Sequence, residues 1–297
     1  MRIALMLSVV LALGSSPAFA QQSGALTAPR PIEAGESLWA EALTWMEVRD
    51  AVAAGTTTII IGTGGVEQNG PYVAGGKHNY VLQTVLPYIA EAIGDALIAP
   101  IVKFVPEGRI EPQPSGHMRY AGTISLEQET FEALLRDICR SYRAHGFADI
   151  VLLGDSGGNQ QGMENVAEQL NEQWRDGPAR VHYLREYYYE DQWSYEFLKA
   201  RGITQIDESA TSEENRDRPT STRNGMHDDV YYEAQIAVQD PELIRANQRL
   251  ATGLFTLHGV DLSPLEETVA LGRALAAYRA EITARAFEVS QQRLRGR

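Results

Sequence analysis

The amino-acid sequence predicts an α/β fold with three layers, in which helices cover both faces of a mainly parallel sheet. Short apolar runs bounded by glycine are typical of strands that are buried on both faces. Such runs are found at residues 57–61, 96–104, 149–153 and 181–184. Amphipathic helical stretches alternate with them, and this alternation favours parallel pairing with a helix in each crossover.

Helical patterns fill the segments between and after these strands. Apolar residues recur at helical spacing over residues 79–93. Ser125 and Gln128 form a capping-box pattern before another apolar stripe. Asp240-Pro241 and Ser263-Pro264 each place a proline where a helix begins. These signals predict four helices with defined starting points.

The amino terminus has the pattern of a secretory signal peptide at residues 1–20: one basic residue, an apolar run, and small residues ending in Ala-Phe-Ala. Residues 21–36 then form a polar tail, and residues 37–297 suit one large domain. An aromatic, acidic and then polar stretch at about 186–224 interrupts the alternation and predicts an insertion or lid. No other apolar run is long enough to span a bilayer. A periplasmic or secreted location is therefore expected, without a membrane span after cleavage.

Charge and cysteine content narrow the class of partner. The formal net charge of −13 argues against nucleic acid or an anionic membrane surface as a partner. The single cysteine, Cys139, excludes an intrachain disulfide and a thiolate metal cluster, and it is expected in the core.

The stretch from Thr56 to Tyr80 carries the first candidate site. After the apolar run it turns through several glycines and brings Glu67, Asn69 and His78 into one loop. Loops at the carboxyl ends of parallel strands are where α/β sheets bind ligands, and glycine lets the backbone approach a bound group. On spacing alone, a solvated turn is the more common explanation of such a loop.

Four stretches, in the same order, resemble motifs of the creatininase (creatinine amidohydrolase) family. GVEQNGPYVAGGKHN is similar to G-x-x-E-Q-H-G-P-H-L-P-L-G-T-D, and GHMRYAGTISL to H-x-x-F-P-G-T-I-S-L. GDSGGN is similar to N-G-H-G-G-N, and GMHDDVYYEAQIAVQDPELI to G-x-H-A-G-E-x-E-T-S-x-x-L-A-L-x-P-E-L-V. The resemblance implies a metal-dependent hydrolase that opens a cyclic amide or a related small non-peptide C–N bond. A lactone or a modified sugar as substrate would fit equally well.

The resemblance also implies which residues form the site, and where this chain departs from the family. Glu67 falls on the family's glutamate ligand, while Asn69 and His78 stand where the family has a histidine ligand and a metal-bridging aspartate. Ser156 stands at another ligand histidine, and Gly158 where some members have a glutamate for a second metal. Imidazole is a good zinc ligand, whereas the side chains of Asn69 and Ser156 are poor ones.

The donors that remain are Glu67, His78 and Asp155, which are expected to hold one divalent metal, zinc or else manganese, with an open position for water. Asp155 has a competing role as a cap of the following helix. His227, at the family's proton-shuttling histidine, and His117 are candidate proton donors to the leaving group. The alternatives for these two are a surface ion pair and a contact that fixes the loop backbone.

The turn after the third strand provides the remaining candidates. The amides of Gly157 and Gly158 are expected to bind an oxyanion, with Ser156 and Asn69 as further substrate contacts. Two other functions stay open: a non-catalytic small-molecule-binding protein that has lost its metals, and a hydrolase with Ser156 as nucleophile. Because family members assemble as trimers or hexamers, a homo-oligomer is expected.

Overall fold

The computed structural model describes residues 26–189, 191–203 and 228–296. The chain divides into two compact units, residues 1–35 and 36–297, and every element named below lies in the second unit. The expected signal peptide lies outside the described residues. So do His227 and most of the polar half of the expected insertion.

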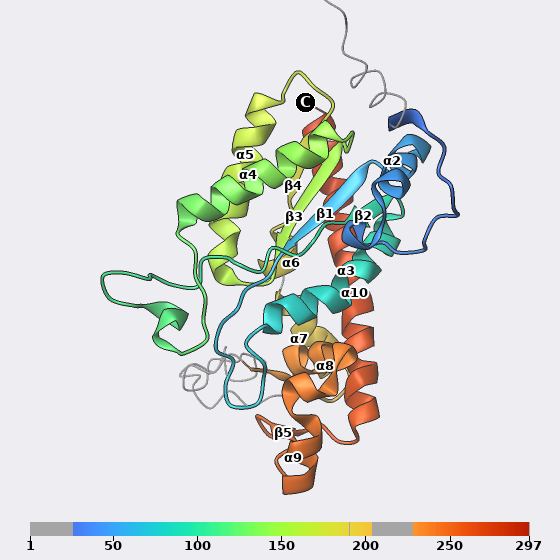
Figure 1. Ribbon diagram of the computed structural model, residues 1–297. Helices are drawn as coiled ribbons and strands as arrows, with labels where there is room; N and C mark the ends of the chain where they lie inside the picture. The colour runs from blue at the N-terminus through green and yellow to red at the C-terminus, as the bar shows by residue number, and fades with distance from the viewer. Residues whose placement is uncertain (1–25, 190, 204–227, 297) are drawn as a thin grey trace, which may run out of the picture. The chain divides into compact units, whose positions relative to one another are not determined.

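Four parallel strands form the central sheet, in the order β2-β1-β3-β4 (Figure 1). They are β1 (Thr58–Thr63), β2 (Ala96–Ile98), β3 (Asp149–Gly154) and β4 (Arg180–Tyr183). The strand expected at residues 96–104 is much shorter and ends at Ile98, two residues before Pro100. Beyond it, only an isolated bridge between Val102 and Thr63 continues the pairing.

Helices connect and flank these strands (Figure 1). The longer ones are α2 (Trp45–Ala54), α3 (Lys77–Ile93), α4 (Gln128–Ala144), α5 (Gln160–Gln173), α7 (Asp191–Lys199), α8 (Val230–Gln239) and α10 (Leu265–Arg295). Shorter elements are η1 (Ala40–Ala42), η2 (Gly116–Arg119), η3 (Gly157–Asn159), α6 (Glu186–Tyr189), η5 (Pro241–Ile244), α9 (Ala246–Thr252), and the hairpin of β5 (Thr256–Leu257) and β6 (Val260–Asp261).

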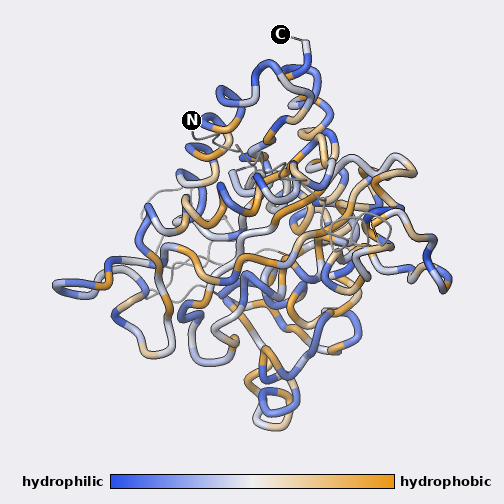
Figure 2. Tube along the Cα trace, turned by 45° about the horizontal axis from the view of Figure 1, so that its top comes forward, coloured by the Kyte–Doolittle hydropathy of each residue, from blue (hydrophilic) through white to orange (hydrophobic). Residues whose placement is uncertain are grey.

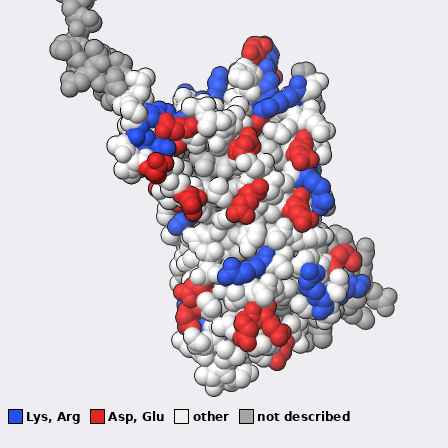
Figure 3. All heavy atoms as spheres, turned by 90° about the vertical axis from the view of Figure 1, so that its right-hand side faces the viewer, with Lys and Arg blue, Asp and Glu red and all other residues white. Residues whose placement is uncertain are grey.

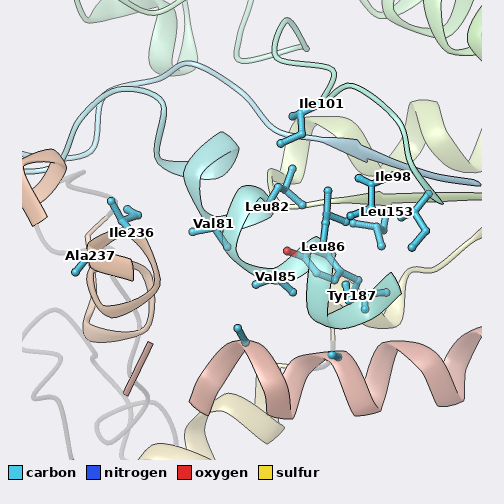
Figure 4. Packing of buried hydrophobic residues seen from close by; sticks show 14 of the residues in the cluster. Val81, Leu82, Val85, Leu86, Ile98, Ile101, Leu153, Tyr187, Ile236 and Ala237 are labelled. Carbon is cyan, nitrogen blue, oxygen red and sulfur yellow. The ribbon is translucent and has the colours of Figure 1, made fainter. Parts of the chain in front are cut away.

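Alternate residues of the strands belong to two separate hydrophobic cores. Ile60 and Val151 pack in the core that α3, α8 and α10 cover. Ile59 and Leu152 pack in the core that α2, α4 and α5 cover. Figure 4 shows Leu86 of α3 directed toward the strand residues of the first core, and Figure 1 shows α4 and α5 on the opposite side of the sheet from α3 and α10. The predicted three-layer α/β/α class is therefore confirmed.

Hydropathy follows these layers. The strands at the centre are apolar, and polar residues lie on the outer turns of the helices (Figure 2). Cys139 is fully buried in the second core, as expected. On the face shown in Figure 3, basic side chains stand among acidic ones. In the part of the chain that the structure describes, no helix combines the length and the apolar character that crossing a membrane requires.

The capping box expected at Ser125 is wrong. Helix α4 begins at Gln128 with Glu127 as its N-cap and without a side-chain cap. The Ser125 hydroxyl instead accepts a hydrogen bond from the Glu107 backbone N–H at 2.9 Å and donates to the Gly108 carbonyl at 2.6 Å. Ser125 therefore fixes the long loop between β2 and α4, and with it the position of Glu107.

Candidate active site

A pocket of about 680 Å³ opens at the carboxyl ends of β1 and β3. This is the edge at which α/β sheets bind ligands. The predicted site residues that line it are Glu67, His78, His117, Asp155, Ser156, Gly157 and Gly158. Asn69 is not among the lining residues. Its side-chain amide donates to the Glu67 carbonyl at 3.0 Å, so Asn69 holds the loop that carries Glu67.

The loop after β1 is tied to the start of α3. Glu67 N–H donates to the Gly75 carbonyl at 2.9 Å. The Asn79 side chain donates to the Gly65 carbonyl at 2.8 Å and accepts from the Gly65 N–H at 3.2 Å. These bonds bring Glu67 next to the first residues of α3, and the glycine run allows that close approach.

His78 lies between two carboxylates. Its Nε2 is 2.9 Å from Glu67 Oε1, and its Nδ1 is 2.8 Å from Asp155 Oδ2. Burial and the charge of Lys77 would lower the pKa of His78, but the bonds to Asp155 and Glu67 outweigh them and raise it to about 9. At neutral pH the ring is therefore an imidazolium that donates to both carboxylates.

Asp155 completes this chain of contacts. Its Oδ1 accepts a hydrogen bond from the Tyr187 hydroxyl at 3.2 Å and lies 3.8 Å from the guanidinium of Arg279. The N-cap of α5 is Asn159, and the Asp155 side chain caps neither α5 nor η3. The helix-cap role considered for Asp155 is therefore wrong.

Lys77 is the second cation beside Glu67. Its Nζ lies 3.3 Å from Glu67 Oε1 and 4.4 Å from the centre of the Tyr232 ring, and only 1% of the residue is exposed. Burial alone would raise the pKa of Glu67. The hydrogen bond and charge of His78, then the charges of Lys77 and His117, more than offset burial and hold the pKa below its ordinary value. Glu67 is therefore ionised at neutral pH.

His117, in η2, contacts the other oxygen of Glu67. Its Nε2 lies 3.1 Å from Glu67 Oε2, and its backbone N–H donates to the Glu107 carbonyl at 3.1 Å. His117 therefore lines the pocket, and its backbone also holds the loop that carries Glu107. Burial lowers the pKa of His117, so its imidazole is neutral at neutral pH.

Glu107 is a site residue that sequence reasoning missed. It is buried, and its Oε2 accepts a hydrogen bond from the Ser156 hydroxyl at 3.3 Å. A Cβ at position 65 would lie 1.9 Å from Glu107 Oε1, so the carboxyl group fits only against a glycine. Burial, and then the charge of Glu67, raise the pKa of Glu107 to about 8. At neutral pH the Glu67 carboxyl group is therefore ionised, whereas the neighbouring Glu107 carboxyl group is protonated.

The turn after β3 forms another wall of the pocket. A Cβ at Gly158 would lie 2.0 Å from the Pro106 carbonyl oxygen, and one at Gly157 would lie 2.9 Å from the Tyr188 hydroxyl. A glutamate at position 158, as some family members have, therefore does not fit here without moving backbone. The Ser156 hydroxyl donates to Glu107, whose carboxyl group is protonated at neutral pH and is therefore not a base that would activate Ser156 as a nucleophile.

The residues predicted to hold zinc lie together, but they bond to one another. Glu67 and Asp155 each direct an oxygen at a ring nitrogen of His78, whereas a metal ligand must direct a lone pair at the ion. Within residues 26–189, 191–203 and 228–296, no group of three His, Cys, Asp or Glu side chains is arranged to hold a metal ion. This arrangement does not fit a metal at the predicted site.

Sequence reasoning also missed Lys77, Arg279, Tyr187 and Tyr232. Only Lys77 among these four had a sequence signal, because it replaces threonine at the family's G-T-D and precedes His78. Arg279 lies in the middle of a 31-residue helix, where nothing in the sequence separates it from the other arginines. Tyr187 and Tyr232 come from α6 and α8, far along the chain from the residues that they contact.

Comparison with known proteins identifies the family of this chain. The profile of the family described as creatininase, creatinine amidohydrolase, matches residues 41–281, which is most of the chain. The creatinine amidohydrolase of Pseudomonas putida is 29% identical over 118 residues. That alignment covers 40% of this chain and 44% of the relative, so it spans less than half of the relative's length.

Solved structures of creatininases share the fold. A creatinine amidohydrolase superposes with a TM-score of 0.57 at 17% identity, a manganese creatininase with 0.57 at 18%, and a zinc–zinc mutant creatininase with 0.58 at 19%. Each superposition covers 87% of this chain and 98% of the other. At these identities the likeness shows the fold alone, whereas the profile match shows the family. The chain therefore belongs to the creatinine amidohydrolase family, whose members are hydrolases of carbon–nitrogen bonds other than peptide bonds.

Proposed function

We propose that this protein hydrolyses a C–N bond in a cyclic amide or a related small non-peptide compound that binds in the pocket at the carboxyl ends of β1 and β3. One observation carries the proposal. The carboxyl groups of Glu67 and Glu107, the imidazole of His117 and the Gly157–Gly158 turn converge on one pocket of about 680 Å³. Family membership indicates the bond class, and a pocket of this volume suits a small ligand.

The Glu67–His117 pair supplies the base. Glu67 is ionised, and its Oε2 lies 3.1 Å from His117 Nε2, close enough to orient the neutral imidazole and to stabilise it once it takes up a proton. The imidazole removes a proton from a water molecule as that water attacks the substrate carbonyl carbon. Gly157 and Gly158 line the same pocket, and in this proposal their amide N–H groups receive the oxyanion that forms.

Glu107 supplies the acid. With a pKa of about 8, its carboxyl group is protonated at neutral pH and gives its proton to the departing nitrogen. The C–N bond then breaks, and the products are a carboxylic acid and an amine. The hydroxyl of Ser156, 3.3 Å from Glu107 Oε2, orients the acid rather than attacking the substrate.

A zinc or manganese ion at Glu67, His78 and Asp155 stays the alternative form of this proposal. When bound, a divalent ion supplies an activated water and polarises a carbonyl group. The descriptions of related structures name manganese and zinc for those proteins. In this chain the mutual bonds of the three side chains favour the metal-free form.

The same bonds favour a second candidate from another class, a small-molecule-binding protein without catalysis. Such a protein would keep the pocket and lose the metals, as the substitutions at Asn69 and Ser156 suggest. An ionised Glu67 beside a neutral His117 argues for the hydrolase, because binding alone does not require that pairing.

The test is a screen of the purified mature protein against cyclic amides, creatinine included, and lactones of the same ring sizes. Ring opening is followed by NMR for wild type, Glu67→Gln and the exposed control Glu129→Gln. Opening of at least one amide by wild type and the control, and its loss in Glu67→Gln, supports the proposal. If only lactones are opened, the bond that the enzyme hydrolyses is an ester and not an amide. Ligand binding without any turnover would favour the binding protein.

Location and assembly belong to the same proposal. A periplasmic or secreted homo-oligomer with a small-molecule substrate is supported by the signal-peptide pattern and by the family resemblance. Fractionation of cells that express the full chain, with the mass of the mature protein, tests the location. Light scattering tests the assembly.

A further inference from the structure

We propose that the ammonium group of Lys77 takes the place of a divalent metal ion in this member of the family, so that its site is complete without metal. The proposal concerns whether the protein binds a metal ion, which goes beyond the proposed reaction. Metal binding can be measured without knowing the substrate. It rests on the contacts of Lys77, on the position of His78 and on the lack of room for further ligands.

The first step is the pairing of Lys77 with Glu67. The side chains are 1% and 2% exposed, and Nζ lies 3.3 Å from Oε1. A buried charge is tolerated only with a partner, and here the ammonium neutralises the one carboxylate that falls on the family's glutamate ligand. The same oxygen also faces the His78 imidazolium at 2.9 Å, so a metal ion would add its repulsion to two cations that already surround Oε1 in a buried site. Lys77 therefore competes directly with a metal for Glu67.

The second step is where Lys77 and His78 lie in the helix. They are the first two residues of α3, which has no acidic residue in its first turn. The amino end of a helix carries partial positive charge, so cations are unfavourable there. The family motif has Thr-Asp at these two positions. The exchange for Lys-His becomes favourable only because Glu67 and Asp155 face the two side chains.

The third step is the space between the two carboxylates. The His78 ring occupies it, with each ring nitrogen at hydrogen-bond distance from an oxygen, 2.9 Å to Glu67 and 2.8 Å to Asp155. The other oxygen of Asp155 faces Tyr187 and Arg279. Both carboxylates are therefore engaged by donors that belong to the chain itself.

The fourth step concerns the remaining ligand positions of the family. Ser156, at the position of a ligand histidine, bonds to Glu107. Position 158 has no room for a glutamate, because the Pro106 carbonyl lies 2.0 Å from the Cβ that it would add. Asn69 holds the backbone of the loop outside the pocket lining. The family's remaining ligand positions therefore supply no further side chain to a metal at Glu67 and Asp155.

The experiment measures metal content and thermal stability of the full mature protein. Zinc and manganese are determined by elemental analysis after purification without chelator, and again after dialysis against each metal. The expected result is far less than one ion per chain in both cases. The melting temperature should then be the same with EDTA, zinc or manganese, because only a ligand that binds the folded state raises it.

A variant that restores the family pattern keeps the test informative. Asn69→His, Lys77→Thr, His78→Asp and Ser156→His together should bind zinc and melt at a higher temperature with zinc than with EDTA. The single variant Lys77→Met should melt lower than wild type. The control variant Lys103→Met, at an exposed lysine, should have the melting temperature of wild type. Lys77→Arg keeps the positive charge, so its melting temperature should fall less than that of Lys77→Met.

Each outcome decides the proposal. One zinc or manganese per wild-type chain, together with a lower melting temperature in EDTA, overturns it, as does a Lys77→Met variant that is as stable as wild type. Absence of hydrolysis by a metal-free protein would refute the proposed reaction and leave this proposal standing. One metal ion per chain in a protein that hydrolyses its substrate would refute this proposal and leave the proposed hydrolysis standing.

Discussion

Two buried histidines in this protein bridge polar partners in nearly the same way, and one of them, His78, lines the candidate active site. His182, in β4, lies with Nε2 2.8 Å from Asp149 Oδ1 and Nδ1 3.0 Å from Ser290 Oγ. These distances match those of a Ser-His-Asp triad. His78 makes bonds of 2.9 Å and 2.8 Å to two carboxylates. Distances alone do not separate the two clusters.

Their positions do separate them. Asp149 is the first residue of β3, so the His182 cluster lies near the amino end of that strand, and Asp149, His182 and Ser290 are all buried. Gln291 and Arg295 of α10 also bond to Asp149. The cluster therefore fastens the end of α10 to the sheet. The His78 cluster lies at the carboxyl ends of the strands and lines a pocket. In that pocket the pKa of Glu67 is lowered, whereas the pKa of Glu107 is raised.

The largest effect should come from removing the base. His117→Gln should reduce turnover about 10²–10⁴-fold, because a positioned base contributes that much, while the melting temperature changes little. The exposed control His145→Gln should retain full turnover. The initial rate of ring opening at saturating substrate is the measurement. A fully active His117→Gln protein would remove His117 from the mechanism.

The opposite result is expected at the other cluster. His182→Leu leaves Asp149 without its imidazole partner inside the protein and should lower the free energy of unfolding by about 3 kcal/mol, since loss of one partner of a buried pair is costly. The turnover of the folded fraction should stay at the wild-type level. Urea unfolding measures the free energy of unfolding, and active-site titration gives the turnover per folded molecule. Lost turnover at unchanged stability would give the Asp149–His182–Ser290 cluster a catalytic role.

Acid should weaken the His182 cluster through Asp149. Burial would raise the pKa of Asp149, but the bond and charge of His182 and the charge of Arg295 outweigh it and hold the pKa below its ordinary value of 3.8. A carboxylate with a lowered pKa in the folded state adds stability above pH 3.8, which is lost as the pH falls through the folded-state pKa. The stability difference between wild type and Asp149→Asn should therefore be constant near neutral pH and shrink in acid. A difference that is independent of pH down to acid unfolding would contradict this.

The smallest effect is expected at Ser156. Ser156→Ala removes a neutral hydrogen bond to Glu107, worth about 1 kcal/mol, so turnover should fall by less than about tenfold. The same rate assay measures it, with melting temperature as the control for folding. Complete loss of turnover in a folded Ser156→Ala protein would revive the serine-nucleophile hypothesis.

Much of this architecture was predictable from sequence because local signals and tertiary structure agree. Continuous apolar runs gave β1, β3 and β4, and parallel strands bring their carboxyl ends to one edge, so Glu67, His78, His117 and Asp155 meet as expected. The overlong prediction for β2 came from treating residues after Pro100 as a strand. The Ser125 signal was misread because its hydroxyl satisfies a loop rather than a helix end.

The rest depends on contacts between segments that are distant in sequence. Glu107 is recognisable only once the loop after β2 has folded back on Gly65, and Arg279 only once α10 packs beside α6. A family pattern predicts ligands by position, but it does not say that Lys77 and His78 will neutralise the carboxylates. Charge balance in a buried site is a property of the folded chain.

Ring opening of a cyclic amide by wild-type protein in excess EDTA, with the metal content of the same sample measured, tests the central claim most directly. The account predicts turnover at the same rate in EDTA as in added zinc or manganese, with far less than one metal ion per chain. Turnover that appears only with zinc or manganese, in step with one bound ion per chain, would contradict it.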